Sequence, residues 1–139
     1  MDYDEIRLSI LRQFYSAMYD GEHSVNVRNN PELKDVPEPV VTANLVYLYD
    51  KGLINGEKRY ADNGRVVVFS ADITARGMDI VEMIVKQSLD RLEPPVIAKI
   101  NEETTTPKKL EKLNEICKQY SAVFDVVIKV VGMIFSNLR

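Results

Sequence analysis

Apolar residues recur at helical spacing at the start of the chain. Ile6, Ile10 and Phe14 lie four positions apart, and acidic residues precede them. This spacing places the three side chains on one face of a helix, and carboxylates suit the positive end of a helix dipole. We therefore predict a helix over 2–19, which Gly21 ends.

Two prolines mark the starts of further helices. In Asn30-Pro31-Glu32, an N-cap asparagine precedes a proline at the first helical position, which is typical of a helix start. This pattern predicts a short helix over 31–36. Residues 23–27, before it, are a candidate for a very short strand. Pro37 breaks this helix, and a second start follows at Glu38-Pro39.

The second helix carries its apolar residues in one stripe. Val41, Leu45 and Leu48 predict a helix over about 38–51. Gly52 then interrupts the apolar run. Only glycine adopts a left-handed backbone without a clash at Cβ, so Gly52 is predicted to end the helix in that conformation.

An Asn-Gly pair separates two strand-like runs. The runs cover 54–60 and 65–70, and Asp62-Asn63-Gly64 lies between them. Asn-Gly in this position is the strongest short-range signal for a β-hairpin. Thr74 follows as a plausible N-cap for a helix that continues to Leu89.

This order of elements resembles the winged helix-turn-helix superfamily, in the form found in prokaryotic transcriptional regulators. The resemblance covers residues 4–92. It rests on Val41-Thr42-x-x-Leu45-x-x-Leu48-x-x-x-Gly52-Leu53-Ile54, on the tip Asp62-Asn63-Gly64, and on Ile73-Thr74-x-x-Gly77. It implies that the helix over 38–51 is a recognition helix and that the hairpin is a wing.

The resemblance also implies a set of DNA contacts. Asn44 is the one outward residue expected on the recognition helix whose side chain suits an adenine, with Thr42 and Tyr47 beside it. Basic side chains near the second helix and the wing tip suit phosphate. A solvated hairpin with ordinary surface lysines is the alternative. The candidate DNA-binding residues are Arg28, Asn30, Lys34, Thr42, Asn44, Tyr47, Lys58, Arg59 and Arg65.

The C-terminal third is more regular. Residues 93–106 contain two prolines and a threonine run, which predicts a linker. Thr106 and Pro107 then suit an N-cap and first position, and a helix over 107–138 would be about 48 Å long at ~1.5 Å per residue. Its apolar residues alternate spacings of three and four, as in a heptad seam. The heptad seam consists of Leu110, Leu113, Cys117, Tyr120, Phe124, Val127, Val131, Ile134 and Leu138.

Such a helix is longer than a small winged-helix core can cover. We therefore expect a homodimer that pairs through the heptad seam. A helix folded back on its own monomer is the alternative. A membrane span is not expected, because the apolar run over 122–138 is short and includes Asp125 and Lys129.

Composition and charge argue against several classes of function. The net charge of −3 argues against a strongly basic nucleic-acid binder. His23 and Cys117 are the only residues of their types, which is too few for a zinc site of the His/Cys type in a monomer. There is no phosphate loop or nucleophile elbow, so we expect neither catalysis nor a cofactor. Charges throughout residues 1–20 argue against a signal peptide, and a lone cysteine suits the cytoplasm.

The sequence thus predicts an α+β, mostly helical protein. Its parts are a winged-helix domain over 1–92, a linker over 93–106 and a dimerisation helix over 107–139. The predicted function is that of a homodimeric transcriptional regulator that binds double-stranded DNA. The alternative is a protein-interaction module that no longer reads DNA. The acidic N-terminal portion and the scarcity of basic residues on the helix over 38–51 favour this alternative, whose docking patch would be Val40, Val46, Tyr47 and Tyr49.

Overall fold

The computed structural model describes residues 1–138. Within these residues the chain is 64% helical, with six α-helices and a two-stranded antiparallel sheet, which confirms the α+β, mostly helical class. Residues 1–79 and 80–138 form two compact units, and each is described by itself.

In the first unit, helix α1 (Tyr3–Tyr19) forms where the apolar spacing predicts it. The Asp2 side chain caps its start by accepting a hydrogen bond from the Glu5 backbone N–H at 2.9 Å. Ile6, Ile10 and Phe14 are fully buried. This face of α1 packs against α2 and β2.

The segment after α1 is less regular than predicted. It forms two 3₁₀ turns, η1 (Val27–Asn29) and η2 (Pro31–Leu33), so the predicted helix over 31–36 is a single short turn. The Asn30 side chain starts η2 as its N-cap, but Pro37 follows too soon for a longer helix to form. The strand predicted over 23–27 is reduced to one bridge, between Val25 and Ala71.

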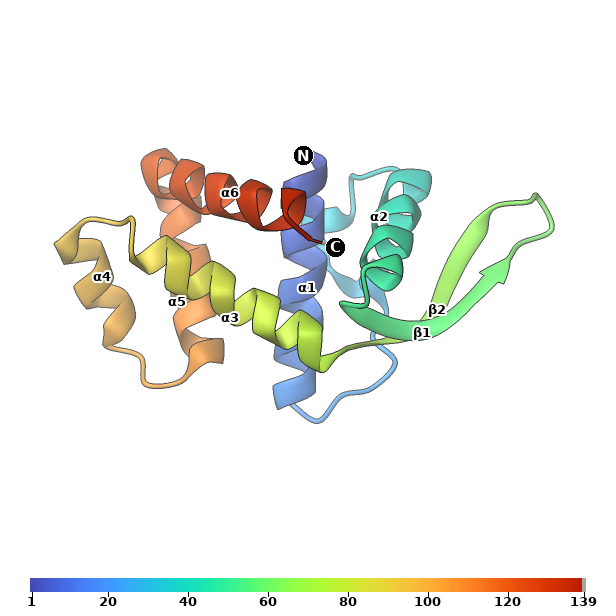
Figure 1. Ribbon diagram of the computed structural model, residues 1–139, viewed down its shortest axis with the longest axis horizontal. Helices are drawn as coiled ribbons and strands as arrows, with labels where there is room; N and C mark the ends of the chain where they lie inside the picture. Colours follow the sequence, from blue (N-terminus) through green and yellow to red (C-terminus); the bar gives the residue numbers. More distant parts are fainter. Residues whose placement is uncertain (139) are drawn as a thin grey trace. The chain divides into compact units, whose positions relative to one another are not determined.

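Helix α2 (Glu38–Asp50) buries Val41, Leu45 and Leu48, the stripe that the sequence predicts. Gly52 ends it with a left-handed backbone, at a φ of +75°. The predicted hairpin is also confirmed, as β1 (Ile54–Tyr60) paired with β2 (Val66–Ile73). The two strands extend away from α2 (Figure 1).

Helix α3 (Ala75–Leu89) begins against the base of the hairpin. The Thr74 hydroxyl accepts a hydrogen bond from the Gly77 N–H at 3.0 Å, as its predicted role of N-cap requires, and donates one to the Gly52 carbonyl at 2.6 Å. Gly77 is buried, and a Cβ at this position would lie 2.1 Å from the Leu53 carbonyl oxygen. The first turn of α3 belongs to the first unit and the remainder to the second.

The second unit contains a helix where the sequence predicts a linker. Helix α4 (Pro94–Asn101) occupies most of 93–106, so the prediction of an irregular linker there is wrong. Pro94 and Pro95 lie in the first turn, where the missing N–H groups need no partner. Ile100, which is fully buried, fixes the far end of α4 in the core.

The predicted long helix is broken in two. Helix α5 (Thr106–Gln119) ends at Tyr120, and helix α6 (Ser121–Ser136) begins directly after it. The Tyr120 backbone is extended, with φ −131° and ψ 109°, which no helix accommodates. Thr105, one residue earlier than predicted, is the N-cap of α5.

The break lets the chain bury its own apolar faces. A single helix of this length would expose one face to solvent, whereas α5 and α6 pack against each other. The buried members of the heptad seam are Leu110, Leu113, Val127, Val131 and Ile134. Cys117, Phe124 and Leu138 are half-buried, and Tyr120 is 58% exposed. The continuous coiled-coil seam predicted for a dimer is therefore not formed.

Helix length and composition also bear on membranes. None of the helices in residues 1–138 combines the length and the apolar character that a bilayer crossing requires.

Replacing Gly77 by alanine tests the packing at the start of α3. Alanine at a helical position ordinarily stabilises a protein relative to glycine by roughly 0.5–1 kcal/mol. Here the added methyl group meets the Leu53 carbonyl oxygen, so we expect a loss of about 1–3 kcal/mol in the free energy of unfolding, measured by urea denaturation.

Gly64→Ala is a comparison variant that tests the backbone alone. Gly64 has a φ of +79°, and a Cβ added there would meet no atom within 4 Å beyond its chain neighbours, so we expect only the cost of a left-handed backbone, about 1–2 kcal/mol. A stability gain for Gly77→Ala would contradict the close approach of α3 to Leu53.

Candidate nucleic-acid interface

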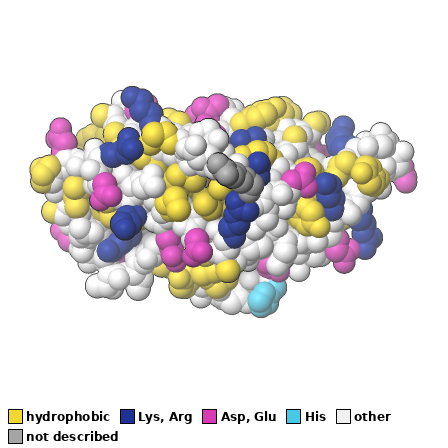
Figure 2. Space-filling model, viewed as in Figure 1, with side chains coloured by type: hydrophobic (Ala, Val, Ile, Leu, Met, Phe, Trp, Pro, Cys, Tyr) yellow, Lys and Arg dark blue, Asp and Glu magenta, His cyan; other side chains and the backbone are white. Residues whose placement is uncertain are grey.

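Three basic residues lie on the exposed part of the hairpin. Lys58 and Arg59 are in β1, Arg65 precedes β2, and all three are exposed. We call Lys58, Arg59 and Arg65 the hairpin cations. Figure 2 shows that positive and negative side chains alternate around the hairpin rather than forming a continuous positive strip.

Carboxylates hold two of the hairpin cations. Lys58 Nζ donates a hydrogen bond to Asp50 Oδ1 at 2.9 Å, and Arg59 forms an ion pair with Glu57. The hydrogen bond to Asp50 raises the pKa of the Lys58 ammonium above its ordinary value. Arg65 forms no ion pair within residues 1–138.

The other two predicted phosphate contacts lie before α2. Arg28 Nη2 is 3.5 Å from Glu38 Oε2, which is at the start of α2. Lys34 is exposed and has no ion pair in the part of the chain that the structure describes. Both side chains are accessible, as a phosphate contact requires.

Asn44 does not face outward, contrary to the prediction. Its side chain is only 1% exposed. Its Nδ2 donates to the Val40 carbonyl at 2.8 Å, and its Oδ1 accepts a hydrogen bond from Arg7 Nε at 2.9 Å. A buried amide with both ends bonded cannot read a base edge. The sequence contains the signal for this, because position 44 is three residues after Val41 and four before Leu48, within the buried stripe.

Asn30 is also a structural residue. It is 6% exposed, its Oδ1 caps η2 by accepting from the Glu32 N–H, and its Nδ2 donates to the Ser9 hydroxyl at 3.0 Å. These contacts fix η2 to α1. Asn30, like Asn44, is therefore removed from the set of accessible DNA contacts.

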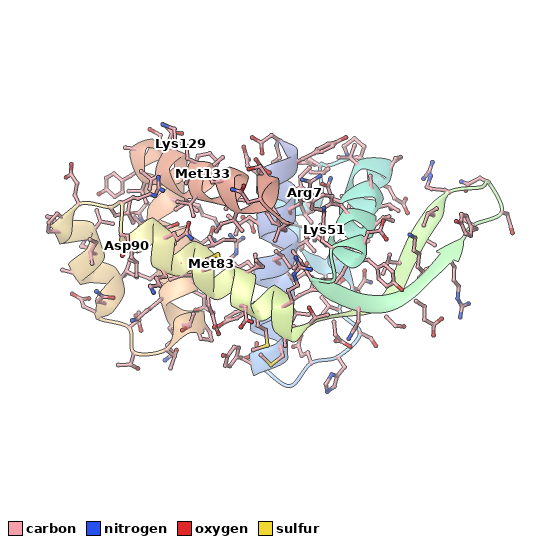
Figure 3. The ribbon with its side chains drawn as sticks, in the orientation of Figure 1. Arg7, Lys51, Met83, Asp90, Lys129 and Met133 are labelled. Carbon is pink, nitrogen blue, oxygen red and sulfur yellow. The ribbon has the colours of Figure 1, made fainter. Side chains whose placement is uncertain are left out.

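Tyr47 and Thr42 remain half-exposed on α2. The Arg7 guanidinium carbon lies 3.6 Å from the centroid of the Tyr47 ring, a cation–π contact, and Lys51 Nζ lies 5.7 Å from the same centroid. Figure 3 labels Arg7 on α1 and Lys51 just after α2. Sequence reasoning missed Arg7, because no local pattern relates position 7 to position 47.

The arrangement can position a phosphate backbone but offers little base recognition. The hairpin cations, Arg28 and Lys34 are all accessible, whereas α2 exposes no basic side chain between Glu38 and Asp50. Phosphate contacts fix the register of a protein on DNA without carrying sequence information.

Residues that could bind a metal ion or act in catalysis do not form a cluster in residues 1–138. Within residues 1–138 no group of three or more His, Cys, Asp or Glu side chains could hold a metal ion. The one histidine, His23, is exposed, and its Nδ1 is 4.0 Å from Asp72 Oδ1. Cys117, the one cysteine of the sequence, is half-buried.

No protein family, curated protein or solved structure matches this chain. The inference of function therefore rests on the residues and contacts described above.

Asn44→Ala should act on stability. The substitution leaves the half-buried Arg7 Nε without its acceptor and removes a bonded amide from the core, so we expect a loss of about 1–3 kcal/mol in the free energy of unfolding. Urea denaturation measures this loss. Thr42→Ala, on the half-exposed side of the same helix, is the control and should change stability by less than about 0.5 kcal/mol. Equal stability of the two variants would contradict a structural role for Asn44.

Proposed function

We propose that the first unit is a winged helix and that the protein binds double-stranded DNA, chiefly through phosphate contacts of the hairpin. One observation carries the proposal: a projecting hairpin with three exposed cations follows directly after a helix that the resemblance identifies as the recognition helix (Figure 1). Packing of α2 against both α1 and the two strands is consistent with such a unit.

The carboxylates beside the hairpin cations do not prevent phosphate binding. Asp50 and Glu57 are more than half exposed at their side chains, 52% and 57%, so both ion pairs are in contact with solvent. Exposed ion pairs contribute only about 0–1 kcal/mol. A DNA phosphate can replace either carboxylate, and the release of counterions from DNA favours the exchange.

In this proposal the first unit recognises the DNA sequence only weakly. Asn44 is buried, and Thr42 and Tyr47 are the polar groups left on the accessible side of α2. The protein would then act as a regulator whose affinity depends mainly on phosphate contacts. We keep a cytoplasmic homodimer in the proposal. Because five members of the heptad seam are buried within the monomer, the dimer contact must use other residues.

Neutralising the hairpin cations tests the proposal. Lys58→Gln, Arg59→Gln and Arg65→Gln together remove about three phosphate contacts. The slope of log affinity against log salt concentration should therefore fall by roughly 2 to 3. Fluorescence anisotropy with a mixed-sequence duplex measures this slope.

A second triple variant matches the charge change. Lys86, Lys108 and Lys118 are exposed residues of the second unit, and their replacement by Gln should leave the slope nearly unchanged. Equal losses in the two triple variants would show that net charge, and not the hairpin, determines binding. Absence of binding by the wild-type protein at 50 mM salt would end the proposal.

Asp50→Asn should strengthen DNA binding. The change removes the carboxylate that competes with phosphate for Lys58 and lowers repulsion, so we expect a gain of roughly two- to fivefold in affinity. Asp20→Asn is the control, because Asp20 is an exposed residue at the end of α1 and its replacement changes the net charge equally. Identical gains for both variants would contradict a specific competition at Lys58.

A protein-interaction module is the second candidate. Tyr60 and Phe69 on the hairpin are 77% and 53% exposed. Within residues 1–138, the edge of β2 that faces away from β1 pairs only through the bridge between Val25 and Ala71. An apolar strand edge of this kind can accept an added strand from another protein. This candidate is favoured if the wild-type protein fails to bind DNA.

A further inference from the structure

The second unit contains a groove among α4, α5 and the start of α6. Its volume is about 500 Å³, within the range of roughly 300–1,000 Å³ that is usual for small-molecule sites. Ile116 and Val123 are buried in its floor, and Val96 and Val126 are half-exposed beside them. We call this feature the second-unit groove.

The fold leaves the groove unfilled. Tyr120, at the break between α5 and α6, lies at its edge with 58% of its surface exposed. In helix α4 only Ile100 is buried, and Pro95, Val96 and Lys99 line the groove. Apolar side chains therefore line a groove that is open to a ligand.

The charged side chains around the groove carry an excess of one positive charge. Three cations, Arg91, Lys99 and Lys112, line the groove together with two carboxylates, Glu93 and Glu115. Within residues 1–138 neither lysine forms an ion pair. Arg91 Nη2 makes a long contact of 4.0 Å with Met133 Sδ, which is weak.

We propose that the second-unit groove binds a small amphipathic anion, a carboxylate that carries a medium-length aliphatic chain. The chain would contact Val96, Ile116 and Val126, and the carboxylate would accept hydrogen bonds from Lys99 or Lys112. The excess positive charge favours an anion over a cation. This proposal is independent of DNA binding.

Decanoate is the probe for the test, with decanol as a neutral molecule of the same chain length. The full chain, labelled with ¹⁵N, is titrated with each and followed by NMR. Decanoate should shift amide signals of α4, α5 and the start of α6, and it should bind about tenfold more tightly than decanol because its head group is charged.

Two variants locate the site and the charge effect. Lys99→Gln with Lys112→Gln should weaken decanoate binding about tenfold and leave decanol binding unchanged. Val126→Trp fills the groove and should weaken both probes. Lys108→Gln with Lys118→Gln, outside the lining, is the charge-matched control. Circular dichroism checks that each variant is folded.

The following results overturn the inference. Equal affinity for decanoate and decanol, or equal effects of the two lysine pairs, removes the anion specificity. Shifts confined to other helices, or no shifts up to the solubility limit of decanoate, remove the site. A misfolded Val126→Trp leaves the lysine pairs and the probe comparison as the deciding measurements.

Discussion

The contact of α3 with the end of α2 and the base of the hairpin is the constraint on which the first unit depends. The Leu53 carbonyl lies against Gly77, and it also accepts a hydrogen bond from the Thr74 N–H at 3.1 Å. The Thr74 hydroxyl joins Gly52 to the first turn of α3. These few groups fix the end of α2, the start of β1 and the start of α3. They therefore determine where the hairpin cations lie.

Local signals predict α1, α2 and the hairpin of the first unit, but not the two 3₁₀ turns between α1 and α2. The apolar spacing of α1 and α2, Gly52 and the Asn63-Gly64 turn all act through neighbouring residues, and each corresponds to an element of the structure. The candidate DNA contacts are predicted less well. The exposed cations are where the sequence places them, but Asn44 is a core residue, and its partner Arg7 comes from a helix that is distant in sequence.

The C-terminal third shows what local patterns omit. Gln119-Tyr120-Ser121 contains neither proline nor glycine, so nothing in the sequence nearby predicts that a helix ends there. The break follows from the burial of both apolar faces within one chain, which is a tertiary effect. The same heptad spacing is compatible with one long paired helix and with two helices packed together. Both arrangements bury one apolar stripe of each helix.

The break at Tyr120 also bears on how the chain folds. Helices α4, α5 and α6 contact their neighbours in sequence, and no loop separates α5 from α6. In the first unit, α1 packs against β2, about fifty positions further along the chain. Contacts between nearby residues form faster than distant ones, so we expect the C-terminal helices to pack before the first unit is complete. Because translation starts at the N-terminus, the slower-folding first unit would be made before the C-terminal helices.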